Sequence, residues 1–107
     1  MIPDKLFAQV KRKLNITWED SDTDARVADI AASADAHLRY LLGLTDAAFT
    51  FDTPGIENML FLAHCFYEWN HALDEFDANY RPLIMQARAK YEAKQWGEED
   101  GAENASN

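Results

Sequence analysis

Apolar positions recur every three or four residues in four segments of the chain, the spacing that is typical of amphipathic helices. The first segment spans residues 3–14 and the second spans 22–42, each with one apolar face. The third, 56–76, is apolar around most of its circumference, and the fourth spans 80–96. These patterns predict an all-α fold, a small bundle of about four helices with a long central apolar helix.

Residues with known positional preferences mark the ends of these helices. Pro3 suits the first turn of the first helix, because it has no N–H to leave unpaired. Asn15 is expected to end that helix, and Gly43 is expected to end the second one in the left-handed conformation. Either Ser21 or Asp22 can cap the second helix. A break is expected at 77–79, between the third and fourth helices.

The 56–76 segment suggests a function in assembly. Winding it at about 100° per residue collects ionisable side chains in one narrow wedge. These are Glu57, His64, Glu68, His71 and Glu75. We expect this wedge to be the solvated edge of the helix, with His64 and Glu68, and His71 and Glu75, as i,i+4 pairs. The rest of a 107-residue chain is expected to cover only one side of so apolar a helix, which predicts a subunit contact on the other.

Four aromatic residues and a strip of alanines are the candidate contact residues. Aromatic side chains most often dominate binding energy at interfaces. The aromatic candidates are Phe61, Trp69, Tyr91 and Trp96. The alanine strip lies on the outward side of the second helix and consists of Ala25, Ala28, Ala32 and Ala36. Alanine is also simply a good helix former, so the strip is either a contact surface or an ordinary solvated face.

Composition divides the chain into a helical domain at 1–96 and an acidic tail at 97–107, which is expected to be disordered. The net charge of −9 disfavours wrapping of nucleic acid, which needs a basic surface. A local basic cluster, Lys11, Arg12 and Lys13, ends the first helix. It either complements the helix dipole or contacts a phosphate or an acidic partner.

The sequence contains neither an apolar run long enough to span a bilayer nor a signal peptide at its start. We therefore expect synthesis in the cytosol and no membrane contact. The single cysteine, Cys65, has no partner for an internal disulfide and is expected to be a buried apolar residue.

No motif makes a case for an enzyme, a metal or a cofactor. Residues 20–24 open like a calcium loop, but Ala25 and Ala31 stand where glycine and a bidentate acid are needed. Glu68 and His71 match half of a di-iron site, and no second Glu-x-x-His occurs. Glycine-rich phosphate loops and nucleophile motifs are also lacking, so we expect no catalytic activity.

The order of elements resembles the small head–tail connector proteins of long-tailed bacteriophages, also known as head-completion or DNA-packaging proteins. The resemblance covers Ile2 to Asn70 and rests on pattern and order. Its elements are Leu14-Asn15-Ile16, then Trp18-Glu19-Asp20, then a helix with Ala31-Ala32, Leu38, Tyr40-Leu41 and Gly43, then Pro54 and Tyr67-Glu68. Family members often carry a basic residue soon after the Tyr-Glu pair, where this chain has Trp69-Asn70-His71.

The resemblance implies a virion structural protein, made in the host cytoplasm, that assembles as a ring beneath the portal. Such a ring, dodecameric in the virion, extends the DNA channel and joins the head to the next neck or tail-completion protein. DNA passes through it without sequence-specific binding. The acidic composition suits that role, because like charge opposes adhesion of DNA. The alternative is a small acidic helical regulator, such as a DNA-mimic inhibitor of a basic host protein.

Overall fold

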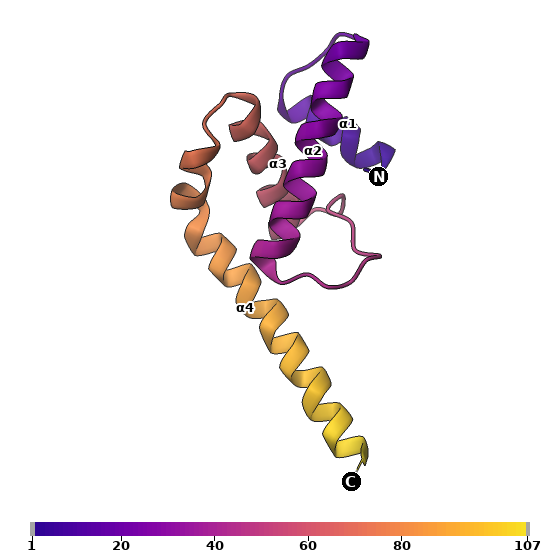
Figure 1. Ribbon diagram of the computed structural model, residues 1–107, viewed down its shortest axis with the longest axis vertical. Coiled ribbons are helices and arrows are strands. Elements are labelled where there is room, and N and C mark those ends of the chain that lie inside the picture. The colour runs from indigo at the N-terminus through magenta and orange to yellow at the C-terminus, as the bar shows by residue number, and fades with distance from the viewer. Residues whose placement is uncertain (1, 107) are drawn as a thin grey trace.

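The computed structural model describes residues 2–106, and the side chains of residues 2–94. It contains four helices and, over the described residues, no strand (Figure 1). They are α1 (Asp4–Lys13), α2 (Ser21–Leu42), α3 (Ile56–Trp69) and α4 (Leu73–Ser106). Helices α2 and α3 contact each other, and α1 and α4 pack against this pair from different sides. The predicted all-α class with about four helices is confirmed.

Helices α1, α2 and α3 all end in the same backbone motif. The residues that end them, Asn15, Gly43 and His71, have φ angles of 61°, 69° and 57°. In each case the next amide donates to the carbonyl five positions back, at 2.8–2.9 Å. The left-handed residue itself donates to the carbonyl three positions back, at 3.1–3.3 Å. This Schellman arrangement satisfies the last carbonyls of each helix, and it confirms Asn15 and Gly43 as stops.

The start of α2 differs slightly from the prediction. Asp20, and not Ser21 or Asp22, is the N-cap. Its Oδ2 accepts hydrogen bonds from the Thr23 amide at 3.0 Å and from the Thr23 hydroxyl at 2.8 Å. These bonds favour the carboxylate and lower the pKa of Asp20.

The boundary between α3 and α4 lies earlier than the sequence predicted. One long helix over 56–76 is not confirmed, because α3 ends at Trp69 and His71 turns the chain before α4 begins at Leu73. The turn lets Phe76 fold back over α3, where its ring centroid lies 5.0 Å from that of His64. Phe76 is almost completely buried there. Burial of this aromatic ring favours the reversal over a continued helix.

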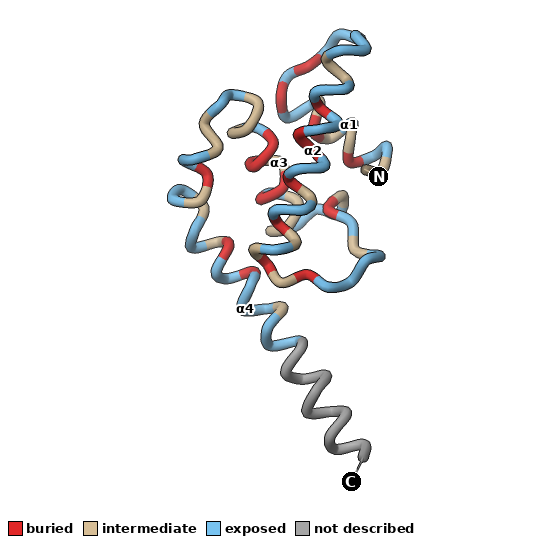
Figure 2. Tube along the Cα trace, viewed as in Figure 1, coloured by how far each residue is buried: buried red, intermediate tan, exposed pale blue. Residues whose placement is uncertain are grey.

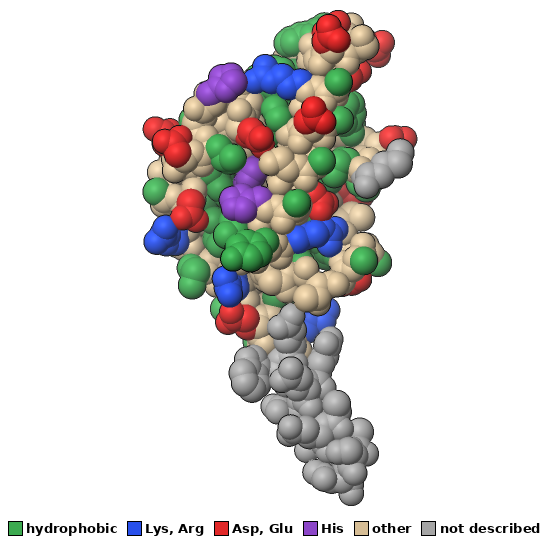
Figure 3. Space-filling view, viewed as in Figure 1, with side chains coloured by type: hydrophobic (Ala, Val, Ile, Leu, Met, Phe, Trp, Pro, Cys, Tyr) green, Lys and Arg blue, Asp and Glu red, His purple; other side chains and the backbone are tan. Residues whose placement is uncertain are grey.

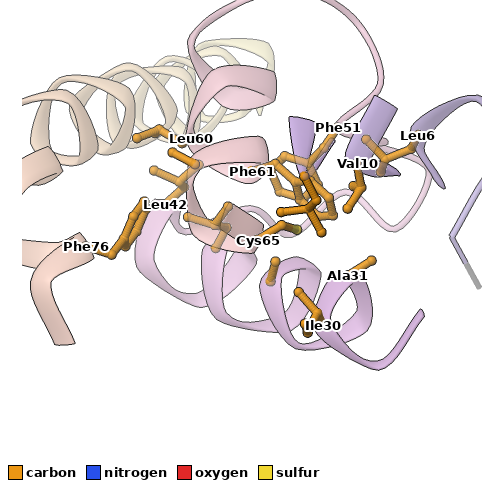
Figure 4. Close-up of a cluster of buried hydrophobic side chains, with 14 of the residues drawn as sticks. Leu6, Val10, Ile30, Ala31, Leu42, Phe51, Leu60, Phe61, Cys65 and Phe76 are labelled. Carbon is orange, nitrogen blue, oxygen red and sulfur yellow. The ribbon is translucent and has the colours of Figure 1, made fainter. Parts of the chain in front are cut away.

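Helix α3 is surrounded by the rest of the chain. Helices α1, α2 and α4 all contact it, and Phe51 from the α2–α3 loop stacks on Phe61 with ring centroids 5.0 Å apart. Figures 2 and 4 show the resulting core between the helices. The expectation that the chain covers only one side of this helix was therefore wrong. Of its large apolar side chains only Met59 and Phe66 remain strongly exposed.

Two expectations concern the C-terminal end of the chain. Helix α4 extends to Ser106, but Trp96 and the acidic tail at 97–107 lie outside the residues whose side chains the structure describes. The predicted disorder of the tail stays a prediction. None of the helices, over the described residues, combines the length and the apolar character needed to cross a bilayer.

Candidate functional site

An open groove of about 940 Å³ runs between α1, α2 and the loop that joins α2 to α3. The outward strip of α2 forms part of its lining through Ala28, Ala32 and Ala36, all of which are exposed. Ala25, the fourth alanine of the predicted strip, is not among the lining residues. Because an alanine side chain is a single methyl group, it lets another backbone approach the helix closely. The structure thus places Ala28 and Ala32 in a concave surface.

The other walls of the groove are mainly apolar. Helix α1 and the residues before it contribute Ile2, Leu6 and Phe7, and the loop contributes Phe49 and Phe51. Leu6 and Phe51 belong to the core, whereas Ile2, Phe7 and Phe49 are only partly buried against it. The groove is therefore a place where the edge of the core remains open to solvent.

Arg39 holds the loop wall of the groove in place. Its guanidinium donates to Asp35 Oδ1 at 2.5 Å, to the Asp46 carbonyl at 3.0 Å and to the Phe49 carbonyl. It also lies 5.7 Å from the ring centroid of Phe51. An arginine can serve several acceptors at once because its donors lie in one rigid plane. This single side chain therefore fixes the loop relative to α2.

Two amide side chains secure the end of the loop from the opposite direction. Gln9 donates to the Asp52 carbonyl at 3.0 Å. Asn58 donates to Gln9 Oε1 at 2.9 Å and to the Phe51 carbonyl at 2.6 Å. The loop is thus tied to α1, α2 and α3, and the groove is preformed in the isolated chain.

Among the described side chains, five large apolar ones lie on the surface away from the core. Their exposed fractions are 50% for Trp18, 81% for Tyr40, 45% for Met59, 41% for Phe66 and 57% for Met85. Figure 3 shows apolar side chains interspersed among charged ones on one face of the molecule. Single exposed apolar residues are common on proteins, so these five side chains do not by themselves indicate a binding surface.

The structure separates the four aromatic contact candidates. Phe61 is fully buried in the core, so this conformation does not offer it to a partner. Trp69 is partly buried, and the Arg26 guanidinium lies 4.1 Å from its ring centroid. Tyr91 is also partly buried, and Trp96 lies outside the described side chains.

Tyr91 and Lys90 attach α4 to the start of α3 through Glu57. The Tyr91 hydroxyl donates to Glu57 Oε1 at 2.9 Å, and Lys90 forms an ion pair with the same oxygen. Burial, together with the hydrogen bond to this carboxylate, raises the pKa of Tyr91 to about 12. Burial opposes ionisation of Glu57, but the bonds from Lys90 and Tyr91 outweigh it and lower the pKa of Glu57.

The basic cluster at the end of α1 makes contacts within the chain. Lys11 forms an ion pair with Asp24 of α2 at 2.9 Å and lies 5.7 Å from the ring centroid of Phe7. The Lys13 ammonium lies 5.8 Å from the ring centroid of Phe66. Arg12 is exposed at the same helix end, where a positive charge complements the helix dipole.

A histidine pair between α2 and α3 was missed by the sequence analysis. His37 Nδ1 lies 2.9 Å from His64 Nε2, and His64 is completely buried instead of lying on a solvated edge. Burial, followed by the nearby His37, lowers the pKa of His64 to about 4. The signal was present in the spacing, because His64 follows the core residues Leu60 and Phe61 by four and three positions.

Glu68 and Cys65 complete this buried region. His64 Nδ1 lies 3.9 Å from Glu68 Oε2, and neither atom has a hydrogen-bond partner among the described residues. Burial raises the pKa of Glu68, although His37 acts in the opposite direction. Burial also raises the pKa of the Cys65 thiol to about 12, which makes it a poor nucleophile. In the described part of the chain, no three His, Cys, Asp or Glu side chains are placed to hold a metal ion.

Comparisons with known proteins found no similar protein. No protein-family model matches the chain. No curated protein and no solved structure matches it either.

Proposed function

We propose that this protein is a structural adaptor, a phage head–tail connector that assembles in several copies beneath the portal and joins the head to the next neck protein. The observation that carries the proposal is the preformed apolar groove, at which the edge of the core remains open to solvent. A surface that is both rigid and apolar favours association, since little ordering entropy is lost when a partner docks.

The distribution of charge supports passage of DNA more than binding of DNA. Residues 1–80 carry fourteen acidic and six basic side chains, and the last eleven residues add four acids without a base. A ring with this balance repels the phosphate backbone and lets DNA slide. The role is structural and asks for no catalytic residue.

The acidic tail at 97–107 has a proposed part in docking to the portal. Acidic segments with few apolar side chains order on binding more readily than alone. Deletion of these eleven residues is expected to weaken portal binding while the helical domain stays folded by circular dichroism. Full portal binding by the shortened protein would remove this role from the tail.

The decisive experiment is size-exclusion chromatography with light scattering on the protein alone and mixed with its cognate portal protein. A ring alone, or a complex formed with the portal, is the expected result, and electron microscopy of that peak shows whether copies are arranged around an axis. A monomer that ignores the portal would overturn the connector proposal and favour the acidic regulator of a basic host protein.

A further inference from the structure

One segment of α4 differs in charge and in surface from the rest of the molecule. Residues 81–94 carry four basic side chains and one acid, whereas residues 1–80 carry fourteen acids and six bases. Three of the four basic side chains are 49–66% exposed, and each forms an ion pair within the chain: Arg81 with Asp77, Arg88 with Glu92 and Lys90 with Glu57. Together with Lys94, the segment still carries more base than acid of its own, and such a segment is attracted to an acidic surface of another copy.

The same segment presents an apolar stripe that no described side chain of its own chain covers. Ile84 and Ala87 face the core, and Tyr91 is partly buried against it. Met85, Ala89 and Ala93 lie on a different side of the helix and are exposed, with Met85 57% exposed. Their spacing of four residues keeps them on one face of α4.

The groove is complementary to this stripe in shape and in charge. Its alanine floor admits a helix at close range, and its charged lining residues are Asp4, Asp35 and Arg39. Asp35 is already bound to Arg39, so Asp4 adds an acidic charge at the rim. The loop beside the groove adds Asp46 and Asp52. No described residue of α4 up to position 94 lines the groove of its own chain.

We propose that the groove of one copy receives the outward stripe Met85–Ala89–Ala93 of α4 from a second copy. This inference rests on the proposed function, because it names the contact through which copies join. The two surfaces lie on different parts of the molecule, so the contact is head-to-tail and a pair of copies keeps one unfilled groove, on one copy, and one uncovered stripe, on the other. Repetition of such a contact produces a ring when the rotation closes.

Cysteine cross-linking between two single variants tests the contact directly. Ala32→Cys places a thiol in the groove and Ala89→Cys places one on the stripe. The native Cys65 is buried and gives little background, which the unmodified protein measures. Under mild oxidation, a covalent dimer is expected in the mixture of the two variants, in excess of what either variant gives alone. Ala8→Cys, exposed on α1 and outside the groove, replaces Ala32→Cys as the matched control.

The cross-linking is performed on the protein alone and on the protein bound to the portal. A dimer of Ala32→Cys with Ala89→Cys in either sample, without one for Ala8→Cys with Ala89→Cys, supports the contact. The absence of that dimer in both samples overturns it. Light scattering of the unmodified protein reports separately on the proposed function: oligomers or portal complexes without the cross-link would refute this contact alone.

Discussion

His37 Nδ1 and His64 Nε2 lie 2.9 Å apart, so a single proton is shared between one exposed and one completely buried imidazole. With the proton on His37 Nδ1, His64 accepts it at Nε2 and directs its own Nδ1–H toward Glu68, 3.9 Å away. Protonation of His64 would place a cation in a buried site beside His37, and both burial and His37 oppose that charge. The contact between α2 and α3 at this point therefore depends on His64 remaining neutral.

The stability of the fold is expected to decrease as the pH falls from 6.5 to 4. In this range His64 is protonated in the unfolded chain, where its pKa is 6.5, but not in the folded one, where it is about 4. The unfolded state then binds more protons, so the free energy of unfolding falls with pH, by about 3 kcal/mol over the whole range. The raised pKa of Glu68 acts in the opposite sense and offsets part of the loss.

Urea unfolding at several pH values measures this dependence. His64→Gln keeps a polar partner for His37 but cannot titrate, so its stability is expected to change less between pH 6.5 and 4. His71→Gln, at an exposed histidine, is the matched control and should keep the dependence of the unmodified protein. An identical dependence in His64→Gln would show that other groups are responsible.

Arg39→Lys is expected to loosen the loop wall of the groove. Lysine keeps the charge but cannot serve Asp35 and the Asp46 and Phe49 carbonyls together. We expect the free energy of unfolding to decrease by about 1–2 kcal/mol, the usual effect of leaving partly buried acceptors unpaired. Hydrogen exchange at 44–51 should also become faster than in the unmodified protein. Arg81→Lys, in an exposed ion pair with Asp77, should change stability by less than about 0.5 kcal/mol.

His71→Gly is expected to stabilise the protein. At φ = 57° the Cβ of a histidine lies too close to the following carbonyl oxygen, which costs about 1 kcal/mol or more; glycine has no Cβ and avoids this cost. Glycine loses more entropy on folding, so the net gain is on the order of 0.5 kcal/mol. Thermal unfolding should show the increase, and Gly43→Ala, at φ = 69°, should show the reverse with a loss of about 1 kcal/mol. A lower melting temperature for His71→Gly would contradict the proposed backbone strain.

Phe61→Ala and Trp69→Ala are expected to separate folding from assembly. Removal of the Phe61 ring leaves a cavity beside Phe51 and should cost about 3–5 kcal/mol of stability. Trp69 is only partly buried, so its truncation should cost less stability and weaken assembly more at equal folded concentration. Denaturant unfolding and light scattering on the same samples measure both quantities. Unchanged oligomers of folded Trp69→Ala would remove this residue from the interface.

The end of α3 shows where sequence reasoning succeeds and where it stops. Asn15 and Gly43 predict the ends of α1 and α2, because both residue types tolerate the left-handed conformation well. His71 adopts the same conformation although histidine is not a usual helix stop, and the apolar spacing continues through the turn to Phe76. The break exists because Phe76 gains its burial only when the chain reverses, which is a tertiary effect that periodicity does not contain.

The groove was only partly accessible to sequence reasoning for a similar reason. The alanine strip was visible as a pattern, since Ala28 and Ala32 share one side of α2. Its concavity comes from the loop, which Arg39, Gln9 and Asn58 hold beside the helix through long-range hydrogen bonds. Such bonds to backbone carbonyls leave no periodic signal. The burial of His64 was likewise masked by the wedge of charged residues in which it falls.

Helix α3 receives its last cover from residues of α4, which follows it along the chain, and this has a consequence for synthesis on the ribosome. Phe76, Ile84 and Ala87 close the core from α4, and they are translated after all the other buried residues between positions 2 and 94. Until they emerge, the apolar side of α3 that they cover stays open to water and to neighbouring nascent chains. Several copies translated from one message would then meet with the same surface uncovered. The time from translation of α3 to docking of α4 is thus the period in which aggregation competes with folding.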